Sequence, residues 1–282
     1  MKIKKITKEN YVGKVYNIGT NNRNYFAELC LVHNCYQDST KEGKHASLEE
    51  IKNLVKDLRE LEVFEVALGG GEPTLHPDFI EILSLFHENQ IVPNFTTFNM
   101  AWTKNQELAE AITYFCKSFA ISTLDIQNLE MLKEWNSQWT WNDKGPKGTL
   151  QIPLGVYPKH KMEEALKYCV GNSIPITFLG FKKFGRGTEI NPADSEWIFS
   201  FIKEHNKFRP FSFGGDTLFV NQFRDQLKKL HVHEVLMVGE EGKFSMYIDA
   251  VEKTIGPSSY VDERYPYSSL KEDILSRFPF NE

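Results

Sequence analysis

The sequence has few cysteines, no long apolar run and no secretory signal. Four cysteines in 282 residues are too few for a small scaffold held together by disulfides. No stretch of 18 apolar residues occurs, so no transmembrane helix is expected. The N-terminal MKIKKITKEN is basic but has no apolar region behind it. With 41% hydrophobic and 25% charged residues, the chain has the composition of a globular protein, and we expect it to be cytoplasmic and reduced.

Excess charge of one sign is also small. The net charge of −5 argues against general nucleic-acid binding. The charge is unevenly divided, because residues 1–34 carry +4 and the remainder carries −9. This division indicates either a solvated basic face or a leader that meets an acidic partner.

Strand and helix patterns alternate about five times between residues 47 and 206. Ser47 and Glu50 have the spacing of a capping box, and apolar residues follow at helical intervals. The expected strands are 63–68, 91–98, 118–123, 149–156 and 174–181, and the expected helices are 47–62, 78–90, 104–117, 125–135, 160–170 and 193–206. The alternation predicts an α/β fold with right-handed crossovers and a parallel sheet or barrel. After residue 207 the pattern loosens into a small α/β tail with helices expected at 219–230 and 268–278.

A glycine-rich motif ends the first of these strands. It reads Gly69, Gly70, Gly71, Glu72 and Pro73. The glycines permit positive φ and close approach of a ligand, the carboxylate can accept hydrogen bonds from a ligand ammonium, and the proline stiffens the turn. In β/α barrels the carboxyl ends of the strands carry the chemistry. Taken alone, the motif is also compatible with a plain turn and an exposed glutamate.

The surroundings of this motif resemble the radical S-adenosylmethionine (radical SAM) superfamily from Cys35 to about residue 187. Cys35-Tyr36 resembles the third cluster cysteine and its aromatic neighbour, about 35 residues before VALGGGEPTLHPDF. Further resemblances are found in PNFTTFN (93–99), QIPLGV (151–156) and ITFLGFKKFGRG (176–187). The resemblance implies a partial (β/α)6 TIM-like barrel, a [4Fe–4S] cluster, S-adenosylmethionine (SAM) and a reductant such as flavodoxin or ferredoxin.

The resemblance also implies roles for single residues. The glycine-rich motif would hold the amino group of SAM, and Ser122 falls where the family often places a ribose contact. The residues implied to contact the cofactor are Tyr36, Gly69, Gly70, Gly71, Glu72, Pro73, Thr97, Asn99 and Ser122, and the implied metal ligand is Cys35.

The cluster motif is incomplete in this chain. A C-x3-C-x2-C motif ending at Cys35 requires cysteines at 28 and 32, where the sequence has Glu28 and Val32, and Cys30 is out of register. Cys116 and Cys169 fall in helical segments and are expected to be buried and inert. We therefore expect that the chain cannot build the cluster alone and that the first barrel strand is missing from it.

Residues 1–34 resemble the C-terminal fragment of a split intein. The matching segments are VYNIG (15–19), NYFAE (24–28) and LVHN (31–34), followed by Cys35. A start Met 34 residues before the junction agrees with such a fragment. The resemblance implies that Cys35 attacks a thioester, that Asn34 cyclises and cuts the Asn34–Cys35 bond, and that His33 assists as an acid or polarising group. Asn17 and Arg23 depart from the usual Asp and His, which would slow splicing unless the partner compensates.

These observations predict three domains: a short all-β C-intein at 1–34, a radical SAM partial barrel at 35–206 and an α/β extension at 207–282. The chain would be a precursor that undergoes trans-splicing with a separate polypeptide, whose N-extein and N-intein supply the first strand and two cluster cysteines. The product would generate a 5′-deoxyadenosyl radical, with peptide or RNA maturation as open possibilities. In the tail, FGGDTLFV (213–220) and IGPSSY (255–260) resemble an auxiliary-cluster extension without its cysteines.

Three alternatives remain open. The chain is a degenerate radical SAM-like domain that serves as a binding module, or it is a one-chain enzyme with a shifted C-x4-C site. A zinc site from Cys30, His33 and Cys35 is a further alternative, although the C-x2-H-x-C spacing is poor for zinc.

Overall fold

The structure is a computed structural model that describes residues 25–27, 30–32, 44–138, 145–181, 195–207, 211–237, 245–259 and 263–277, the first two segments by their backbone only. The chain divides into two compact units, Met1–Asn34 and Cys35–Glu282. In the first unit, β1 (Tyr25–Ala27) and β2 (Cys30–Val32) form an antiparallel hairpin. VYNIG, His33, Asn34, Cys35 and Tyr36 lie outside the described residues.

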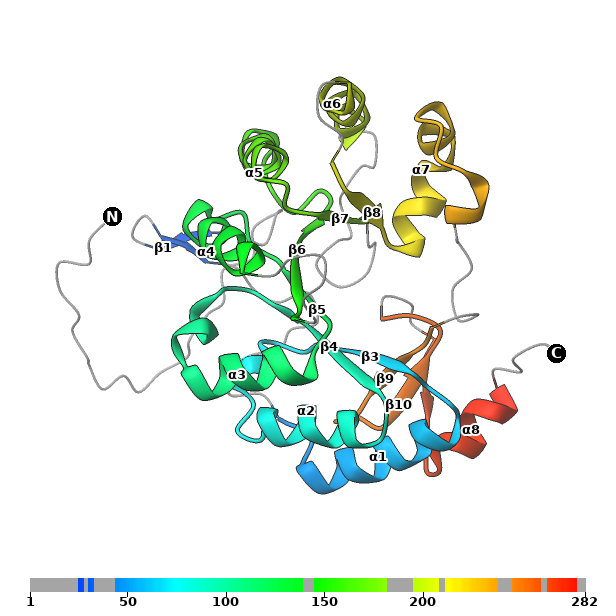
Figure 1. Ribbon diagram of the computed structural model, residues 1–282. Helices are drawn as coiled ribbons and strands as arrows, with labels where there is room; N and C mark the ends of the chain where they lie inside the picture. The colour runs from blue at the N-terminus through cyan, green and yellow to red at the C-terminus, as the bar shows by residue number, and fades with distance from the viewer. Residues whose placement is uncertain are drawn as a thin grey trace. The chain divides into compact units, whose positions relative to one another are not determined.

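A parallel sheet of six strands forms the centre of the second unit (Figure 1). Its strands lie side by side in chain order, from β3 to β8. They are β3 (Glu65–Leu68), β4 (Val92–Thr97), β5 (Ser118–Ile121), β6 (Lys147–Pro153), β7 (Ile176–Leu179) and β8 (Phe213–Gly215). The α/β architecture expected from the alternating pattern is confirmed. Within the described residues, β3 and β8 are the two edge strands of this sheet. No described strand pairs with the outer edge of β3.

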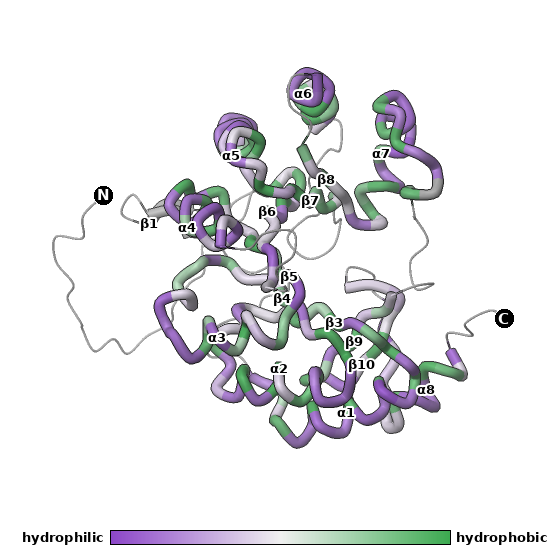
Figure 2. The backbone as a smooth tube through the Cα atoms, viewed as in Figure 1, coloured by the Kyte–Doolittle hydropathy of each residue, from purple (hydrophilic) through white to green (hydrophobic). Residues whose placement is uncertain are grey.

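Helices form an arc around the outside of this curved sheet (Figure 1). They are α1 (Leu48–Glu60), α2 (Phe79–Glu88), α3 (Gln106–Phe115), α4 (Ile126–Ser137), α5 (Lys159–Asn172), α6 (Trp197–Asn206) and α7 (Thr217–Lys229). The capping box at the start of α1 is confirmed, because the Ser47 side chain accepts from Glu50 N–H and the Glu50 carboxylate accepts from Ser47 N–H. Hydrophobic and hydrophilic residues alternate along these helices (Figure 2), as expected when one face packs on a sheet.

The two faces of the sheet have different chemistry. Alternate residues such as Phe95, Leu150 and Phe178 are fully buried in the main core, which lies between the sheet and its helices. Because successive strand residues point to opposite faces, the residues between them belong to the inner face. That face is largely polar: it includes Asn94, Thr96, Thr149, Gln151 and Thr177, and Thr96, Ala120 and Thr149 are paired across β4, β5 and β6.

The C-terminal part of the chain, expected as an α/β extension at 207–282, contributes a strand to the main sheet. FGG of FGGDTLFV is β8, which pairs with β7 and extends the main sheet beyond residue 206. A second sheet has the order β11-β10-β9, made of β9 (Tyr247–Asp249), β10 (Thr254–Gly256) and β11 (Tyr265–Pro266). This sheet and α8 (Leu270–Arg277) share a second core with α1 and α2. Leu218, in FGGDTLFV, is the second residue of α7, and Ser258, in IGPSSY, follows β10, so the two segments belong to different elements.

No helix in the described part of the chain is long and apolar enough to cross a membrane.

Candidate functional site at the carboxyl edge of the sheet

The glycine-rich turn follows β3 directly and is exposed. Gly70 has φ +127°, a conformation that side chains with L configuration rarely adopt, so its glycine is required by the backbone. Gly69 has no such requirement, and a Cβ placed on it or on Gly70 would meet no atom within 4 Å. Neither conformation nor packing within the described chain explains the glycine at 69. Its missing side chain leaves open space over the turn, where a ligand can approach the backbone.

The carboxylate of Glu72 fastens this turn to the end of β4. One oxygen accepts from the Thr74 hydroxyl at 2.6 Å and the Thr74 N–H at 3.3 Å, and the other accepts from the Phe98 N–H at 2.8 Å. The Thr97 hydroxyl lies 2.9 and 3.0 Å from the two oxygens and 2.9 Å from the Asn99 carbonyl. The structure thus brings Glu72 and Thr97 together, with the Glu72 oxygens already engaged by the chain itself.

The Asn99 side chain accepts a hydrogen bond within the turn that it belongs to. Its carbonyl oxygen accepts from Ala101 N–H at 2.8 Å, at the start of the short helix η2 (Ala101–Lys104). This contact places the side chain in a local turn that follows β4, beside the carboxyl edge.

Ser122 lies beside the end of β4 and is surrounded by polar groups. Its N–H donates to the Thr97 carbonyl at 2.9 Å, and its hydroxyl donates to the Gln151 amide oxygen at 3.2 Å. The Tyr157 hydroxyl donates to the Ser122 carbonyl at 3.0 Å. Burial raises the pKa of Tyr157 to about 12, so this phenol remains a hydrogen-bond donor at neutral pH.

Gln151 and Tyr157 were not predicted as site residues. Gln151 is the one polar residue of QIPLGV and lies on the inner face, and Tyr157 directly follows that segment, so the only sequence signal is a glutamine within an otherwise apolar hexapeptide. Together with Thr97 and Ser122 they form a cluster of neutral donors and acceptors from the ends of β4, β5 and β6.

The carboxyl edge continues, at the end of the sheet opposite β3, with the residues that follow β7. Asp216 accepts from Gly180 N–H at 2.9 Å and from Phe219 N–H at 2.7 Å, which caps α7. The Gln222 amide pairs with both main-chain groups of Phe181, at 2.7 and 2.8 Å. A Cβ on Gly180 would lie 2.6 Å from Phe219 N, so α7 approaches β7 closely only because residue 180 is glycine.

Metal ligands are not assembled in the part of the chain that the structure describes, where no group of three His, Cys, Asp or Glu side chains could hold an ion. Cys116 and Cys169 are fully buried, as expected, and burial raises the pKa of each thiol to about 12. Such thiols are poor metal ligands because the thiolate is the binding form. At the spacing of the expected motif the sequence supplies Cys35 alone, so this chain by itself does not fit a three-cysteine cluster.

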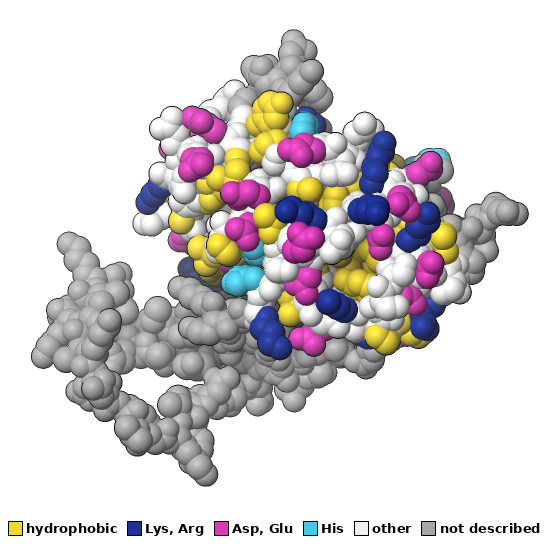
Figure 3. Space-filling model, turned by 90° about the horizontal axis from the view of Figure 1, so that it is seen from below, with side chains coloured by type: hydrophobic (Ala, Val, Ile, Leu, Met, Phe, Trp, Pro, Cys, Tyr) yellow, Lys and Arg dark blue, Asp and Glu magenta, His cyan; other side chains and the backbone are white. Residues whose placement is uncertain are grey.

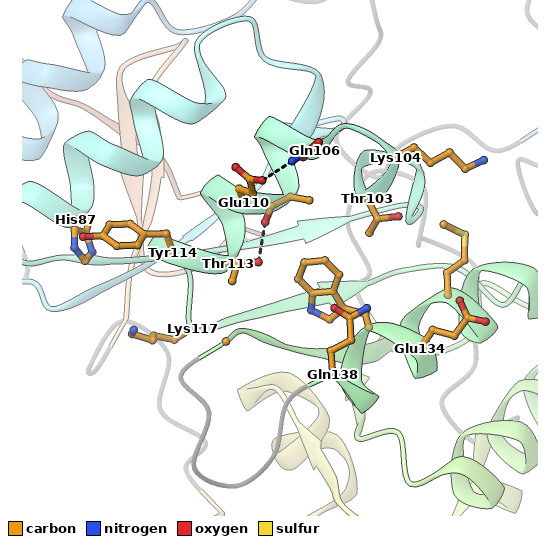
Figure 4. Close-up of a pocket in the computed structure, with 14 residues that line it drawn as sticks. His87, Thr103, Lys104, Gln106, Glu110, Thr113, Tyr114, Lys117, Glu134 and Gln138 are labelled. Carbon is orange, nitrogen blue, oxygen red and sulfur yellow. Dashed lines mark hydrogen bonds between the residues drawn. The ribbon is translucent and has the colours of Figure 1, made fainter.

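A groove between α3 and α4 lies on the helical side of the sheet, away from the polar face (Figure 4). Lys117, which lines it, directly precedes β5 at the amino end of the strand. Trp135, another lining residue, belongs to the main core. The groove therefore lies among the outer helices and η2, and not on the polar inner face of the sheet.

Acidic and basic side chains are interspersed on the face drawn in Figure 3, without a continuous basic area.

Part of the chain is similar to a known family and to known proteins. Residues 33–143 match the sequence model of the Radical SAM superfamily. Over 73 residues the chain is 30% identical to mycofactocin maturase MftC of Mycobacterium tuberculosis and 29% identical to that of Mycolicibacterium smegmatis, a segment that covers 26% of this chain and 19% of those proteins.

The fold has solved counterparts of low sequence identity. The crystal structure of Streptococcus suis SuiB bound to precursor peptide SuiA has a TM-score of 0.62 at 16% identity, covering 86% of this chain and 61% of SuiB. SuiB bound to S-adenosylmethionine has a TM-score of 0.60 at 16% identity, covering 87% and 62%. This chain therefore spans about a fifth of the length of the MftC proteins and under two thirds of SuiB. Residues 33–143 thus resemble the radical SAM domain, and enzymes of that superfamily use a [4Fe–4S] cluster and S-adenosylmethionine.

Proposed function

We propose that this chain forms the body of a radical SAM enzyme that binds SAM at the GGGEP turn and modifies a peptide. The observation that carries the proposal is Gly69, whose missing side chain is required neither by φ nor by packing and opens the turn at the carboxyl edge of a parallel sheet. The peptide substrate is suggested by the similar proteins, a mycofactocin maturase and a SuiB structure bound to a precursor peptide.

The residues of the chain would bind and orient the cofactor. Main-chain carbonyls of Gly69, Gly70 and Gly71 would accept hydrogen bonds from the SAM ammonium, while Glu72 holds the turn against β4. Ser122, Gln151 and Tyr157 offer hydrogen-bonding groups for the ribose hydroxyls. Asn99 would contact the cofactor beside these three residues. When bound, the [4Fe–4S] cluster supplies the electron that cleaves the sulfonium of SAM, with Cys35 as this chain's own ligand and Tyr36 beside it.

We further propose that trans-splicing completes the cluster site. This proposal is supported by His33-Asn34-Cys35, by the antiparallel hairpin just before it, and by the division of the chain into compact units at the Asn34–Cys35 bond. A partner polypeptide would supply the two cysteines that this sequence lacks at 28 and 32. The free edge of β3, within the described residues, offers the partner's strand a place to pair.

Each splicing residue has a chemical step. The Cys35 thiolate attacks the partner's thioester carbonyl and displaces the partner's thiolate. The Asn34 side-chain nitrogen then attacks its own main-chain carbonyl, which breaks the Asn34–Cys35 bond and forms a succinimide, with His33 polarising that carbonyl. The freed Cys35 amine attacks the new thioester, so that an ordinary peptide bond replaces it.

The cofactor proposal is tested with spliced, reconstituted protein and a reductant. It should cleave SAM to 5′-deoxyadenosine. Glu72→Ala should weaken SAM binding by about tenfold or more, because hydrogen bonds to a carboxylate each contribute about 1.5–3 kcal/mol. Glu81→Ala removes an exposed carboxylate from α2 and is the matched control. Wild-type turnover in Glu72→Ala would contradict the assignment.

The splicing proposal is tested by intact-mass measurement after this chain is mixed with its partner. Residues 1–34 should be lost and the N-extein gained. Asn34→Ala should block release of the leader, and Cys35→Ala should block ligation. An unchanged mass with a verified partner would overturn the proposal. The rival reading, a degenerate binding module, predicts that no form of the body ever binds iron.

A further inference from the structure

His76 joins two segments that are 30 residues apart. Its Nε2 lies 3.1 Å from the carbonyl oxygen of Ala46, and its Nδ1 accepts from Asp78 N–H at 3.1 Å. A carbonyl can only accept, and a main-chain N–H can only donate, so both contacts together require the neutral ring with its proton on Nε2. The imidazole therefore uses both nitrogens, one for a local turn and one for a long-range contact.

These two contacts connect the beginnings of two helices. Asp78 is the residue before α2, and Ala46 precedes Ser47, which caps α1. The His76 backbone is extended, with φ −64° and ψ 130°, and the following proline favours this conformation whatever the side chain.

The segment 72–76, which directly follows the three glycines, is thus held at both ends. Glu72 attaches its beginning to the end of β4, and His76 attaches its end to the start of α1. Between them lies the short helix η1 (Pro73–Leu75), whose hydrogen bonds to Glu72 and His76 are local. With the His76 attachment removed, this segment keeps its local bonds but is held to the rest of the sheet by Glu72 alone, so that it and the glycines before it can move.

We propose that His76 is a positioning residue for SAM, which sets the orientation of the glycine carbonyls through its bond to Ala46. This inference depends on the proposed function of Gly69, Gly70 and Gly71. His76 touches no cofactor in this scheme. Its contribution is to keep the turn fixed before SAM arrives, so that binding does not have to order it.

Two substitutions separate the two contacts of the ring. In His76→Asn, the side-chain oxygen can still accept from the N–H two residues on, as in an Asx-turn, but the side chain is too short for Ala46. In His76→Gln, the terminal amide can reach the Ala46 carbonyl, but the local bond is lost. His45→Ala is the control, because the exposed His45 ring packs edge-on against His76 at 5.1 Å without entering either bond.

The first measurement is hydrogen exchange in the full, unspliced chain without cofactor. We expect His76→Asn to speed exchange in residues 72–79 at least tenfold, and His76→Gln and His45→Ala to stay within threefold of wild type. The second is SAM binding and turnover of the spliced, reconstituted enzyme. His76→Asn should raise KM for SAM about tenfold with kcat unchanged, and His76→Gln should restore it.

The outcomes distinguish this inference from the proposed function. If the wild-type enzyme fails to bind SAM, the proposed function is wrong, and with it the inferred role. If it binds SAM but His76→Asn matches wild type in exchange and KM, only the inference about His76 is overturned. Equal loss in both His76 variants, with a lowered Tm, would also overturn it, since that result marks a general structural role.

Discussion

Gly69 and Gly70 are neighbours, but only the backbone conformation of Gly70 requires glycine. Gly70→Ala should lower the free energy of unfolding by about 1–2 kcal/mol, because its φ of +127° is costly for a residue with a Cβ. Gly69→Ala should change stability by less than about 0.5 kcal/mol yet weaken SAM binding, because the methyl group enters the open space over the turn. Urea denaturation of the two variants, with SAM binding measured beside it, tests this. Equal destabilisation would contradict it.

Single residues with local partners were predictable from the sequence, and those with distant main-chain partners were not. Ser47 and Glu50 are three residues apart and were predicted as a capping box. Tyr157 and His76 donate to carbonyl oxygens 35 and 30 residues away. Every residue carries a carbonyl, so nothing in the sequence marks which one serves as the acceptor. Such residues become visible only when the fold places the two segments together.

At the scale of elements, one buried side chain connects three strands. The Asn94 amide donates to Glu65 at 2.7 Å, and its oxygen accepts from Ser118 N–H at 2.8 Å, which ties together the beginnings of β3, β4 and β5. Asn94→Ala should destabilise the body by about 1–3 kcal/mol, because it removes the hydrogen bonds that the buried Asn94 amide makes to the Glu65 carboxylate and the Ser118 N–H. Asn53→Ala on the exposed face of α1 is the control. Equal urea midpoints would show that the connection contributes little.

The elements found by periodicity were those long enough to show it. Strands β3 to β7 and the helices between them lie within a few residues of the predicted ranges. β8 was missed because it has three residues, two of them Gly214 and Gly215, and glycine has a low strand propensity. Its strand conformation depends on pairing with β7, which is a tertiary effect. The strands of the second sheet have only two or three residues each, which is too short for an alternating pattern to show in the sequence.

At the scale of the whole molecule, the two buried thiols predict an alkaline loss of stability. Burial raises the pKa of Cys116 and of Cys169 from 9.0 to about 12. Between these values the unfolded chain has lost protons that the folded chain keeps, so stability is full below pH 9 and falls as pH rises toward 12. At pH 10 the loss is about 1.4 kcal/mol for each thiol.

Urea denaturation at pH 8 and pH 10 measures this loss. The double variant Cys116→Ala, Cys169→Ala should be less stable at pH 8, because each change leaves a small cavity, but its stability should fall less between the two pH values. The difference between variant and wild type removes the contribution of lysines and tyrosines, which titrate in both. The same fall in both proteins would show that the thiols ionise without cost.

The contacts of Gln222 have a consequence for the order in which the protein is made. Gln222 pairs with Phe181, 41 residues earlier, and Asp216 binds Gly180, so the end of β7 has these partners only after α7 has left the ribosome. At 5–20 residues per second, that delay is roughly 2–8 s. During this interval the other strands can already pair, while the rim of the site beside β7 waits. A ribosome that pauses within α7 would therefore hold a nearly complete sheet whose carboxyl edge beside β7 is unfinished.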